Sequence, residues 1–548
     1  MSFRRIVEPF RTFADVARNP AMRNLQLAGI GSTLGIWAYG VAMAVYAYRA
    51  DGATAVGLLY FVRWCAAGAC APWLALLADR MSRRRVMLAS DVLRAALVGA
   101  IAAATAAGAP SLVVYALAVL ASIAGAAFQP AESALLPSLA TTPEELTAAN
   151  VALGTTASIG VFVGPALAGI LLSVGSTPLV FAVTAACFVW SWACISRISP
   201  DVPPVQEGPP ERLGRALLAG FRAIGGDPRL RLLTGLSGAG MFVIGALDVL
   251  VVVVALSVLH TGNGGVGWLN AALGVGSIVG GIVASALAGT RRLARDLGIG
   301  LVLFGLPLAV SAATTSLVLV VALFALVGMG STVGDVAGTT LLQRTAGDEL
   351  LGRVFGVLQS LVYVNLAVGA ALTPVLVRVL GARGALVAVG ALLPLLYVVL
   401  RSRIRTLDRE ARDTADTIAL MRETTIFAML PGPVLEQLAV GARDVEVSAG
   451  SNVVEQGDVG DRFYILASGR VVALVDGREV RELVSGESFG EIALLRDVPR
   501  TATVRATEDV RLVAFERDAF LGAVTGHAPS HAAAERVVAE RLPAAVPI

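Results

Sequence analysis

An acidic and a basic residue near the end of the chain flank a short stretch of helix-forming residues. The stretch reads Gly486-Glu-Ser-Phe-Gly-Glu491-Ile-Ala-Leu-Leu-Arg-Asp-Val-Pro499-Arg500. Free N–H groups and the positive dipole end at the start of such a helix suit a phosphate. Arg500, beyond the turn at Pro499, can contact that phosphate with two N–H groups. Glu491 instead accepts a hydrogen bond from a sugar hydroxyl. The two residues predict a ribose-phosphate site; the alternative is a surface ion pair worth about 0–1 kcal/mol.

Ionisable side chains inside long apolar stretches are costly and usually functional, and three of them are Asp248, Arg63 and Asp335. Asp248 is the deepest carboxylate, and we expect it to carry protons. The alternative is a carboxylate that is hydrogen-bonded to a neighbouring Ser, Thr or Asn. Arg63 either faces a cavity or pairs with Asp248. Asp335 lies near a cytoplasmic helix end, where a salt bridge that closes a gate is the expected role.

The other polar residues do not predict an enzyme. The four cysteines lie in apolar runs without a CxxC pair, and the three histidines are scattered, so neither a metal site nor a disulfide framework is expected. The sequence shows no nucleophile–base pair and no phosphate-binding loop of a nucleotide hydrolase. We therefore expect no catalytic residue, no metal and no cofactor.

The composition places these residues in a membrane protein. Of 548 residues, 56% are hydrophobic and 15% are charged, and the mean hydropathy is +0.76, whereas soluble domains carry about 25% charged residues. The net charge of +3 does not predict nucleic-acid binding. A helix needs about 20 apolar residues to span the hydrocarbon core. Twelve such stretches are predicted, at residues 24–48, 54–77, 86–107, 111–129, 149–173, 178–196, 230–258, 266–289, 297–313, 315–337, 354–379 and 384–400.

The two halves of the membrane part resemble each other. Phe13-Ala-Asp-Val-Ala-Arg-Asn-Pro20 precedes the first stretch, and Phe221-Arg-Ala-Ile-Gly-Gly-Asp-Pro228 precedes the seventh. Shorter pairs recur at nearly the same offset, namely Val56-Gly57 with Val266-Gly267, and Gly164-Pro165 with Thr373-Pro374. The repeat predicts two six-helix halves, which is the architecture of many secondary transporters with a substrate site between the halves.

Arginine placement predicts the orientation in the membrane. Arginines concentrate before the first stretch, after the second and eighth stretches and at the end of the twelfth, whereas the opposite loops are nearly free of them. Both termini are therefore expected in the cytoplasm. After residue 405, alternating runs such as Phe463-Tyr-Ile-Leu466 are separated by glycines and predict antiparallel β-structure. Helical patterns at 426–441 and 516–542 flank these strands.

The predicted fold class is an all-α membrane transporter of twelve transmembrane helices in two six-helix halves, plus a cytoplasmic β-roll with flanking helices. The predicted parts are a cytoplasmic amphipathic N-terminus at 1–23, the N-terminal half at 24–197, a cytoplasmic central loop at 198–229, the C-terminal half at 230–400, a helical connector at 401–424 and the β-roll domain at 425–548.

Several motifs in the membrane part resemble those of the major facilitator superfamily. Leu77-Ala-Asp79-Arg80-Met-Ser-Arg83-Arg84-Arg85 is similar to the loop signature of that family, Gly-x-x-x-Asp-Arg-x-Gly-Arg-Arg, and Gly160-Val-Phe-Val-Gly164-Pro165 resembles the antiporter motif of its exporters. Phe128-Gln-Pro-Ala131 resembles a motif of the siderophore and drug-efflux branch of this family. The resemblance covers about residues 10–400 and implies a charge relay that includes Asp91 and Arg94. Transport or coupling roles are thus predicted for Asp79, Arg80, Arg83, Arg84, Asp91, Arg94, Gly164 and Pro165, besides Asp248, Arg63 and Asp335.

The stretch around Glu491 resembles the phosphate-binding cassette of cyclic-nucleotide-binding domains, Phe-Gly-Glu-x-Ala-Leu followed by Pro-Arg-x-Ala-x-Val. This resemblance covers about residues 425–542. It implies that Glu491 binds the ribose 2′-hydroxyl and that Arg500 binds the phosphate of cAMP, with cGMP left open. It further implies that the backbone of Gly490, Ile492 and Ala493 contributes, that Thr501 and Ala502 border phosphate and base, and that Val537, Val538 and Leu542 of the last helix cover the base.

Together these features predict a proton-coupled exporter of small amphipathic molecules that a cyclic nucleotide regulates. One alternative is a membrane-tethered cyclic-nucleotide receptor whose carrier fold does not transport, and another is a carrier whose tail serves only assembly. The expected partners are a cyclic nucleotide, a small-molecule substrate and the lipid bilayer, with no nucleic acid. The oligomeric state, a dimer included, is left open. The expected location is a bacterial-type plasma (inner) membrane, crossed many times.

Overall fold

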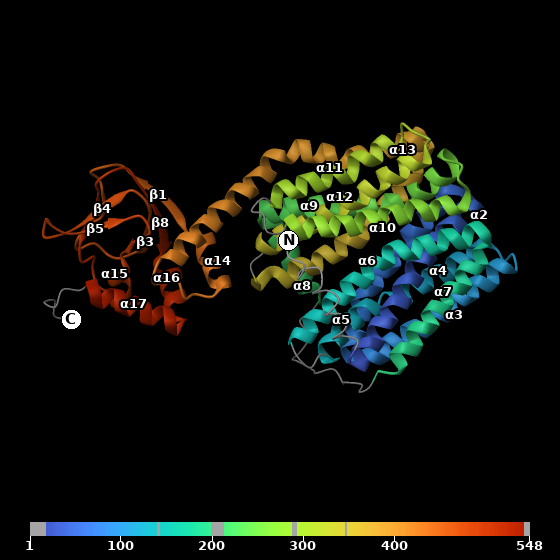
Figure 1. Ribbon diagram of the computed structural model, residues 1–548, viewed down its shortest axis with the longest axis horizontal. Coiled ribbons are helices and arrows are strands. Elements are labelled where there is room, and N and C mark those ends of the chain that lie inside the picture. Colours follow the sequence, from blue (N-terminus) through green and yellow to red (C-terminus); the bar gives the residue numbers. More distant parts are fainter. Residues whose placement is uncertain (1–17, 140–142, 199–212, 288–292, 346–347, 542–548) are drawn as a thin grey trace. The chain divides into compact units, whose positions relative to one another are not determined.

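The chain folds into a helical unit and a unit that contains β-sheets. The computed structural model describes residues 18–139, 143–198, 213–287, 293–345 and 348–541. The two compact units are Met1–Arg405 and Thr406–Ile548. Figure 1 follows the chain from the blue N-terminal helices through the green and yellow helices to the orange strands and red helices of the β-unit.

The first helices follow the predicted apolar stretches. α2 consists of two helices joined at Asp51 and Gly52, where the backbone leaves helical geometry and Gly52 has a φ of +76°. Glycine adopts this φ at low cost, so Gly52 forms the turn between the first two stretches. The N-terminal half consists of α2 (Pro20–Arg80), α3 (Arg83–Ala106), α4 (Ser111–Gly125), α5 (Phe128–Leu139), α6 (Pro143–Val174) and α7 (Thr177–Ser196).

The C-terminal half repeats this arrangement. Gly381, with a φ of +74°, interrupts α13 as Gly52 interrupts α2. The elements from the central loop onward are α8 (Leu213–Gly226), α9 (Pro228–Val253), the π-helix η1 (Val254–Val258), α10 (Gly262–Leu287), α11 (Leu293–Ser311), α12 (Leu317–Thr345) and α13 (Asp348–Glu423).

Part of the predicted central loop is helical. Within residues 198–229, Leu217, Phe221 and Ile224 recur at helical spacing on α8, and Ile224 is buried. This spacing is typical of a short helix, so the segment Leu213–Gly226 of the predicted loop is helical. Residues 199–212 of the predicted loop, and residues 1–17 of the predicted N-terminus, lie outside the described residues.

The helical unit has the surface of a membrane protein. Ten helices of the described residues are long and apolar enough to cross a membrane, and two of them include the broken helices α2 and α13. When the two parts of each broken helix are counted separately, the spans equal the predicted stretches in number. Trp73, Val174 and Val318 are at least three-quarters exposed, as expected for side chains that face lipid. The predicted all-α membrane part is confirmed.

Glycines bring the two halves into close contact at several places, and two of these contacts join the repeated motifs. A Cβ atom on Gly57 of α2 would lie 2.3 Å from Cγ of Pro374 on α13. A Cβ atom on Gly267 of α10 would lie 2.2 Å from Cα of Gly169 and 2.7 Å from the carbonyl oxygen of Pro165, both on α6. No side chain fits at these distances. The repeated Gly and Pro positions of the two halves therefore meet each other, in the Gly57–Pro374 contact and the Gly267–Pro165 contact.

The second unit contains two antiparallel four-stranded sheets, with strand orders β1-β8-β3-β6 and β2-β7-β4-β5. This is the predicted β-roll with flanking helices, and the prediction is confirmed. The strands are β1 (Arg443–Val447), β2 (Asn452–Val454), β3 (Arg462–Ser468), β4 (Arg470–Val475), β5 (Arg478–Val484), β6 (Ser488–Phe489), β7 (Thr503–Ala506) and β8 (Val510–Glu516). The helices are α14 (Gly432–Gly441), α15 (Glu491–Arg496), α16 (Arg517–Thr525) and α17 (Ala528–Arg541).

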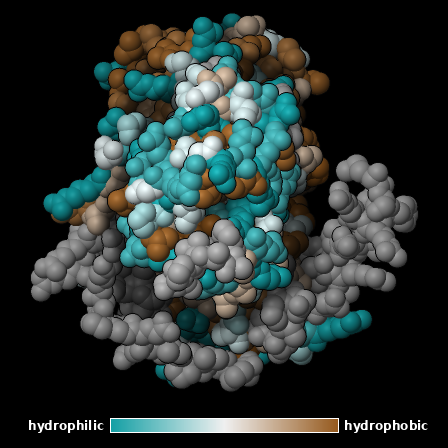
Figure 2. Space-filling view, turned by 90° about the vertical axis from the view of Figure 1, so that its left-hand side faces the viewer, coloured by the Kyte–Doolittle hydropathy of each residue, from teal (hydrophilic) through white to brown (hydrophobic). Residues whose placement is uncertain are grey.

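Two apolar clusters hold this unit together. Leu466 and Leu512 of one sheet pack with Val471 and Val504 of the other. On the outer face of the first sheet, aromatic rings join strands to helices, and the rings of Phe463 and Phe520 stack with their centres 4.4 Å apart. Figure 2 shows mainly hydrophilic side chains over the β-sheet unit, with isolated hydrophobic residues among them. The apolar residues are thus mostly inside, as in a soluble domain.

Candidate functional site

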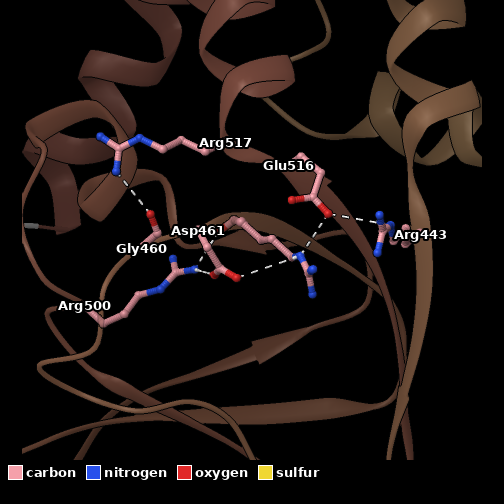
Figure 3. Close-up of polar contacts among 7 residues, drawn as sticks. Arg443, Gly460, Asp461, Arg500, Glu516 and Arg517 are labelled. Atoms are coloured by element: carbon pink, nitrogen blue, oxygen red, sulfur yellow. Dashed lines mark hydrogen bonds and ion pairs between the residues drawn. The ribbon is translucent and has the colours of Figure 1, made fainter.

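Two loops of the β-unit hold Arg500 between them. The backbone N–H of Arg500 donates to the Asp458 carbonyl at 2.7 Å, and its carbonyl accepts from the Gly457 N–H at 2.9 Å. The guanidinium donates through Nη1 to the Gly490 carbonyl at 3.2 Å, and through Nη2 to the Arg462 carbonyl at 2.7 Å and to Asp461 Oδ1 at 3.2 Å. Figure 3 shows Arg500 directed toward Asp461. Both ends of this side chain are thereby fixed.

Aromatic rings form the wall beside this arginine. Tyr464 on β3 stacks on Phe489 on β6 with the ring centres 5.1 Å apart, and the Arg500 guanidinium lies 5.8 Å from the Tyr464 ring centre. Burial, and then the charge of Asp461, raise the pKa of the Tyr464 phenol above its ordinary value. The ring therefore stays neutral beside the guanidinium at physiological pH.

A row of charged residues continues from the arginine toward β8 (Figure 3). Nε of Arg462 lies 3.9 Å from Asp461 Oδ2 and donates to Glu516 Oε1 at 3.2 Å, and Arg443 Nε lies 3.6 Å from the same glutamate oxygen. The Glu516 carboxylate raises the pKa of the Arg462 guanidinium. The Asp461 side chain is 63% exposed whereas the Arg500 side chain is 3% exposed, so an anionic ligand can displace the aspartate from the arginine.

The Glu491 carboxylate is buried, and only one of its two oxygens accepts a hydrogen bond from a described residue. Its Oε1 accepts a hydrogen bond from Nη1 of Arg541, at the end of α17, at 2.9 Å, and the same Nη1 donates to the Ser488 carbonyl at 2.6 Å. Its Oε2 is buried and has no partner among the described residues. Because an unpaired buried carboxylate oxygen is costly, this oxygen is available to a ligand hydroxyl.

The other predicted nucleotide-site residues lie around these two. Gly490 precedes α15 with a φ of +97°. Ala493 is buried, Ile492 and Ala502 are half-buried, and Thr501 is exposed. Of the predicted lid, Val538 is buried and Val537 is half-buried on α17, and Leu542 lies outside the described residues.

The helical unit contains a cavity of about 560 Å³ that residues of both halves line. Arg63 is part of its wall; its Nε donates to Ser122 Oγ at 2.7 Å, and it forms no ion pair with Asp248 among the described residues. Asp248 Oδ2 accepts a hydrogen bond from Trp64 Nε1 at 3.1 Å. The sequence predicts that Arg63 either faces a cavity or pairs with Asp248, and the structure shows that it faces the cavity. Trp64 is the partner of Asp248, in place of the predicted Ser, Thr or Asn.

The predicted charge relay is an ion pair inside the N-terminal half. Arg94 Nη2 is hydrogen-bonded to Asp91 Oδ1, and Ser191 Oγ donates to Asp91 Oδ2 at 2.6 Å. Arg94 and Asp91 are 2% and 0% exposed. The Arg94 guanidinium lies between the rings of Phe128 and Phe188, 4.4 Å from each ring centre. The ion pair with Asp91 and the two aromatic rings therefore hold the Arg94 side chain in place.

Two loop-signature arginines contact carbonyl groups of neighbouring helices, and the carbonyl that Arg84 contacts lies at a helix C-terminus. Arg83 donates to the Ala134 carbonyl of α5 at 2.8 Å, and Arg84 donates to the Ser196 carbonyl of α7 at 2.7 Å. Cations at helix C-termini are stabilising. The side chains of Asp79 and Arg80 lie outside the described part of the chain.

The remaining predicted transport residues lie on α6 and α12. A Cβ atom on Gly164 would lie 2.6 Å from Cβ of Trp37 on α2, so this glycine allows α6 to approach α2 closely. Pro165 lies inside α6 and takes part in the Gly267–Pro165 contact. Asp335 forms no salt bridge with another described residue, so the predicted gate bridge is not seen in this state.

The fold and the site define a class of protein, namely a membrane transporter with an added β-roll domain. This domain buries an arginine and a glutamate in one site. Family models agree with this class. The model described as Major Facilitator Superfamily matches residues 25–295 and 245–442, and the model described as cyclic nucleotide-binding domain matches residues 444–527. The chain belongs to the Major Facilitator Superfamily and carries a C-terminal cyclic nucleotide-binding domain.

Known proteins resemble the C-terminal domain. A cAMP-dependent protein kinase regulatory subunit of Emericella nidulans is 36% identical over 104 residues, 19% of this chain and 25% of that protein. A cGMP-dependent protein kinase of Eimeria tenella is 33% identical over 123 residues, 22% of this chain and 12% of that protein. The solved regulatory domain of Toxoplasma gondii PKA with cAMP is 29% identical, covering 22% of this chain and 47% of that chain, with a TM-score of 0.21. The chain spans a quarter or less of the length of these two curated relatives.

Proposed function

We propose that the chain is a proton-coupled exporter of small amphipathic molecules, and that cAMP or cGMP bound to its C-terminal domain regulates the transport cycle. One observation carries the regulatory part. Glu491, the first residue of α15, is 1% exposed, and Arg500, beyond the end of this helix, is 4% exposed. Glu491 Oε2 has no partner among the described residues. A cyclic nucleotide has one phosphate, which can accept hydrogen bonds from Arg500, and a free ribose hydroxyl, which can donate one to Glu491 Oε2.

The arginine retains donors for this phosphate. A guanidinium has five N–H groups, and Arg500 uses three of them on Gly490, Arg462 and Asp461. The contact with Asp461 is exposed and replaceable. The similarity to a cAMP-dependent and to a cGMP-dependent kinase supports a cyclic purine nucleotide without separating the two.

Regulation requires that the nucleotide affinity differ between the states of the carrier. In sequence, the last membrane segment passes directly into the connector at 401–424 and then into the nucleotide domain. A difference of about 1–3 kcal/mol is typical of such coupling, and it acts in both directions. Titration of cAMP with the carrier locked inward or outward tests this proposal, and equal affinities in the two states would contradict it.

Replacing Arg541 by glutamine is expected to weaken cAMP binding by about three- to tenfold, because one charged hydrogen bond that holds Glu491 is lost. Arg541 also joins α17 to the Ser488 carbonyl. The control is Arg536→Gln, an exposed arginine on the same helix. Isothermal titration calorimetry on the full chain measures both, and equal affinities in the two variants would exclude a role of Arg541 in the site.

Replacing Gly490 by alanine is expected to weaken cAMP binding at least about tenfold, since the new Cβ would lie 2.6 Å from Nη1 of Arg500 and move the guanidinium from its phosphate. Gly486→Ala is the control. Gly486 has a φ of +90°, and no heavy atom lies within 4 Å of its added Cβ. Both positions have a φ at which alanine is strained, by about 1–2 kcal/mol, so an equal loss of affinity would trace the effect to strain alone.

The transport part rests on the cavity between the halves and on Asp248 behind its wall. The purified chain is reconstituted in liposomes with the pH-sensitive dye pyranine inside, and a panel of drugs and siderophores is added under a pH gradient. A transporter moves protons when a compound of the panel is its substrate, and added cAMP changes the rate.

The receptor alternative predicts no proton movement with any compound. It is favoured by one feature of the sequence, the second-half copy of the loop signature at Thr290-Arg-Arg-Leu-Ala-Arg295, which lacks the acid. Nucleotide binding without flux would support it and would overturn the transport function.

A further inference from the structure

The wall of the carrier cavity contains an arginine, Arg63, that forms no ion pair with a described residue. The volume of about 560 Å³ lies in the range of sites for drug-sized molecules. Among the described residues that line it, the charged ones are Arg63 and Arg94, and none is acidic. Arg94 is paired with Asp91. Arg63 forms no ion pair with a described residue, so it is the cation available to a ligand.

Two polar atoms of this wall have no hydrogen-bond partner. Nη1 of Arg63 and Oη of Tyr39 are both buried and unpaired among the described residues. Cζ of Arg63 lies 5.1 Å from the centre of the Tyr39 ring. Unpaired buried donors are unfavourable. A carboxylate has two acceptor oxygens and no donor, so it is the kind of group that these two donors lack.

The rest of the wall suits a flat apolar body. Trp64 and Phe188 come from the N-terminal half and Tyr363 from the C-terminal half, and the ring centres of Trp64 and Tyr363 are 6.2 Å apart. Uncharged Gln129 and Gln359 add polar groups without adding charge. Aromatic rings prefer stacked or edge contacts with other rings. Both halves therefore contribute to a site for rings, while one half alone supplies the cation.

The geometry points to amphipathic organic anions as the substrate class, each with an aromatic or apolar body and one acidic group that binds Arg63 and Tyr39. This inference rests on the proposed transport function and narrows it. A cationic amphiphile is disfavoured, because it would place a second positive charge beside Arg63.

Two probes of the same shape and opposite charge test this inference. 1-Naphthylacetate and 1-naphthylmethylammonium are titrated by equilibrium dialysis against the full chain in lipid nanodiscs, with binding to empty nanodiscs subtracted. We expect the anion to bind at least about tenfold more tightly than the cation. Arg63→Gln should weaken anion binding at least about tenfold and leave the cation unaffected or more tightly bound. Tyr39→Phe, which removes a single hydroxyl, should weaken it by a smaller factor.

Arg378→Gln is the matched control, since Arg378 is an exposed arginine of α13 outside the cavity wall, and it should not change either affinity. Thermal unfolding shows whether each variant is folded; if Arg63→Gln does not fold, Tyr39→Phe decides. A preference for the cation, no anion binding at millimolar concentration, or an unchanged anion affinity in the folded variants overturns the inference. A chain that binds the anion through Arg63 but gives no flux in liposomes supports it and overturns transport instead.

Discussion

Replacing Arg500 by alanine is expected to weaken cAMP binding at least about a hundredfold, because two charge-assisted hydrogen bonds to the phosphate are lost, each worth about 1.5–3 kcal/mol. The loss includes the organisation of the site, since the same guanidinium holds Asp461 and the carbonyls of Gly490 and Arg462. Calorimetric titration of the full chain with cAMP and with cGMP measures the effect and the preference between the two.

Two further variants serve as comparisons. One tests whether the planar guanidinium is needed in addition to its positive charge, and the other tests whether loss of any exposed arginine weakens binding. Arg500→Lys keeps the charge but loses the planar fork, and an intermediate affinity is expected. Arg505→Ala removes an exposed arginine of β7 and should have no effect. Full affinity in Arg500→Ala would place the nucleotide elsewhere in the domain, or outside it.

Replacing Asp248 by asparagine is expected to lower proton-driven flux at least about tenfold, the scale associated with loss of a positioned proton-transfer group. Asparagine still offers a carbonyl oxygen to Trp64 Nε1, which donates to Asp248 Oδ2 at 3.1 Å. The substitution therefore removes the exchangeable proton and keeps the contact. Proton movement in liposomes loaded with pyranine measures the result.

The comparison variant is Asp51→Asn. Asp51 is exposed at the break in α2, and its carboxylate accepts a hydrogen bond from Tyr115 at 2.8 Å, so the substitution likewise keeps an acceptor oxygen. Flux should remain at the wild-type level. A wild-type rate in Asp248→Asn would show that another group carries the proton.

Local signals in the sequence predicted the architecture. Long apolar runs fix membrane helices because the bilayer leaves the backbone few alternatives. Turn glycines mark the ends of strands in a similar way. Gly477 and Gly486 have φ values of +78° and +90°, which glycine adopts at low cost, so the chain can turn at these positions. The residues of the cassette around Glu491 are close in sequence, so the pattern that places them in one site could be recognised there.

Contacts between distant positions could not be predicted. Arg541 meets Glu491 from 50 residues away, Arg63 meets Ser122 from 59 away, and Trp64 meets Asp248 from 184 away. Each depends on the rotation of one helix against another element, and hydropathy does not encode this rotation. The role of Arg541 in particular has no local signal, because an arginine at the end of a helix is usual.

The Gly57–Pro374 contact and the Gly267–Pro165 contact have a geometric consequence. Neither contact leaves room for a side chain, so the backbone of α2 lies directly against α13 and the backbone of α10 lies directly against α6. Small residues let helices approach this closely in a membrane. Any larger residue at Gly57 or Gly267 would push the two halves apart, so glycine at these positions sets how closely the halves can approach.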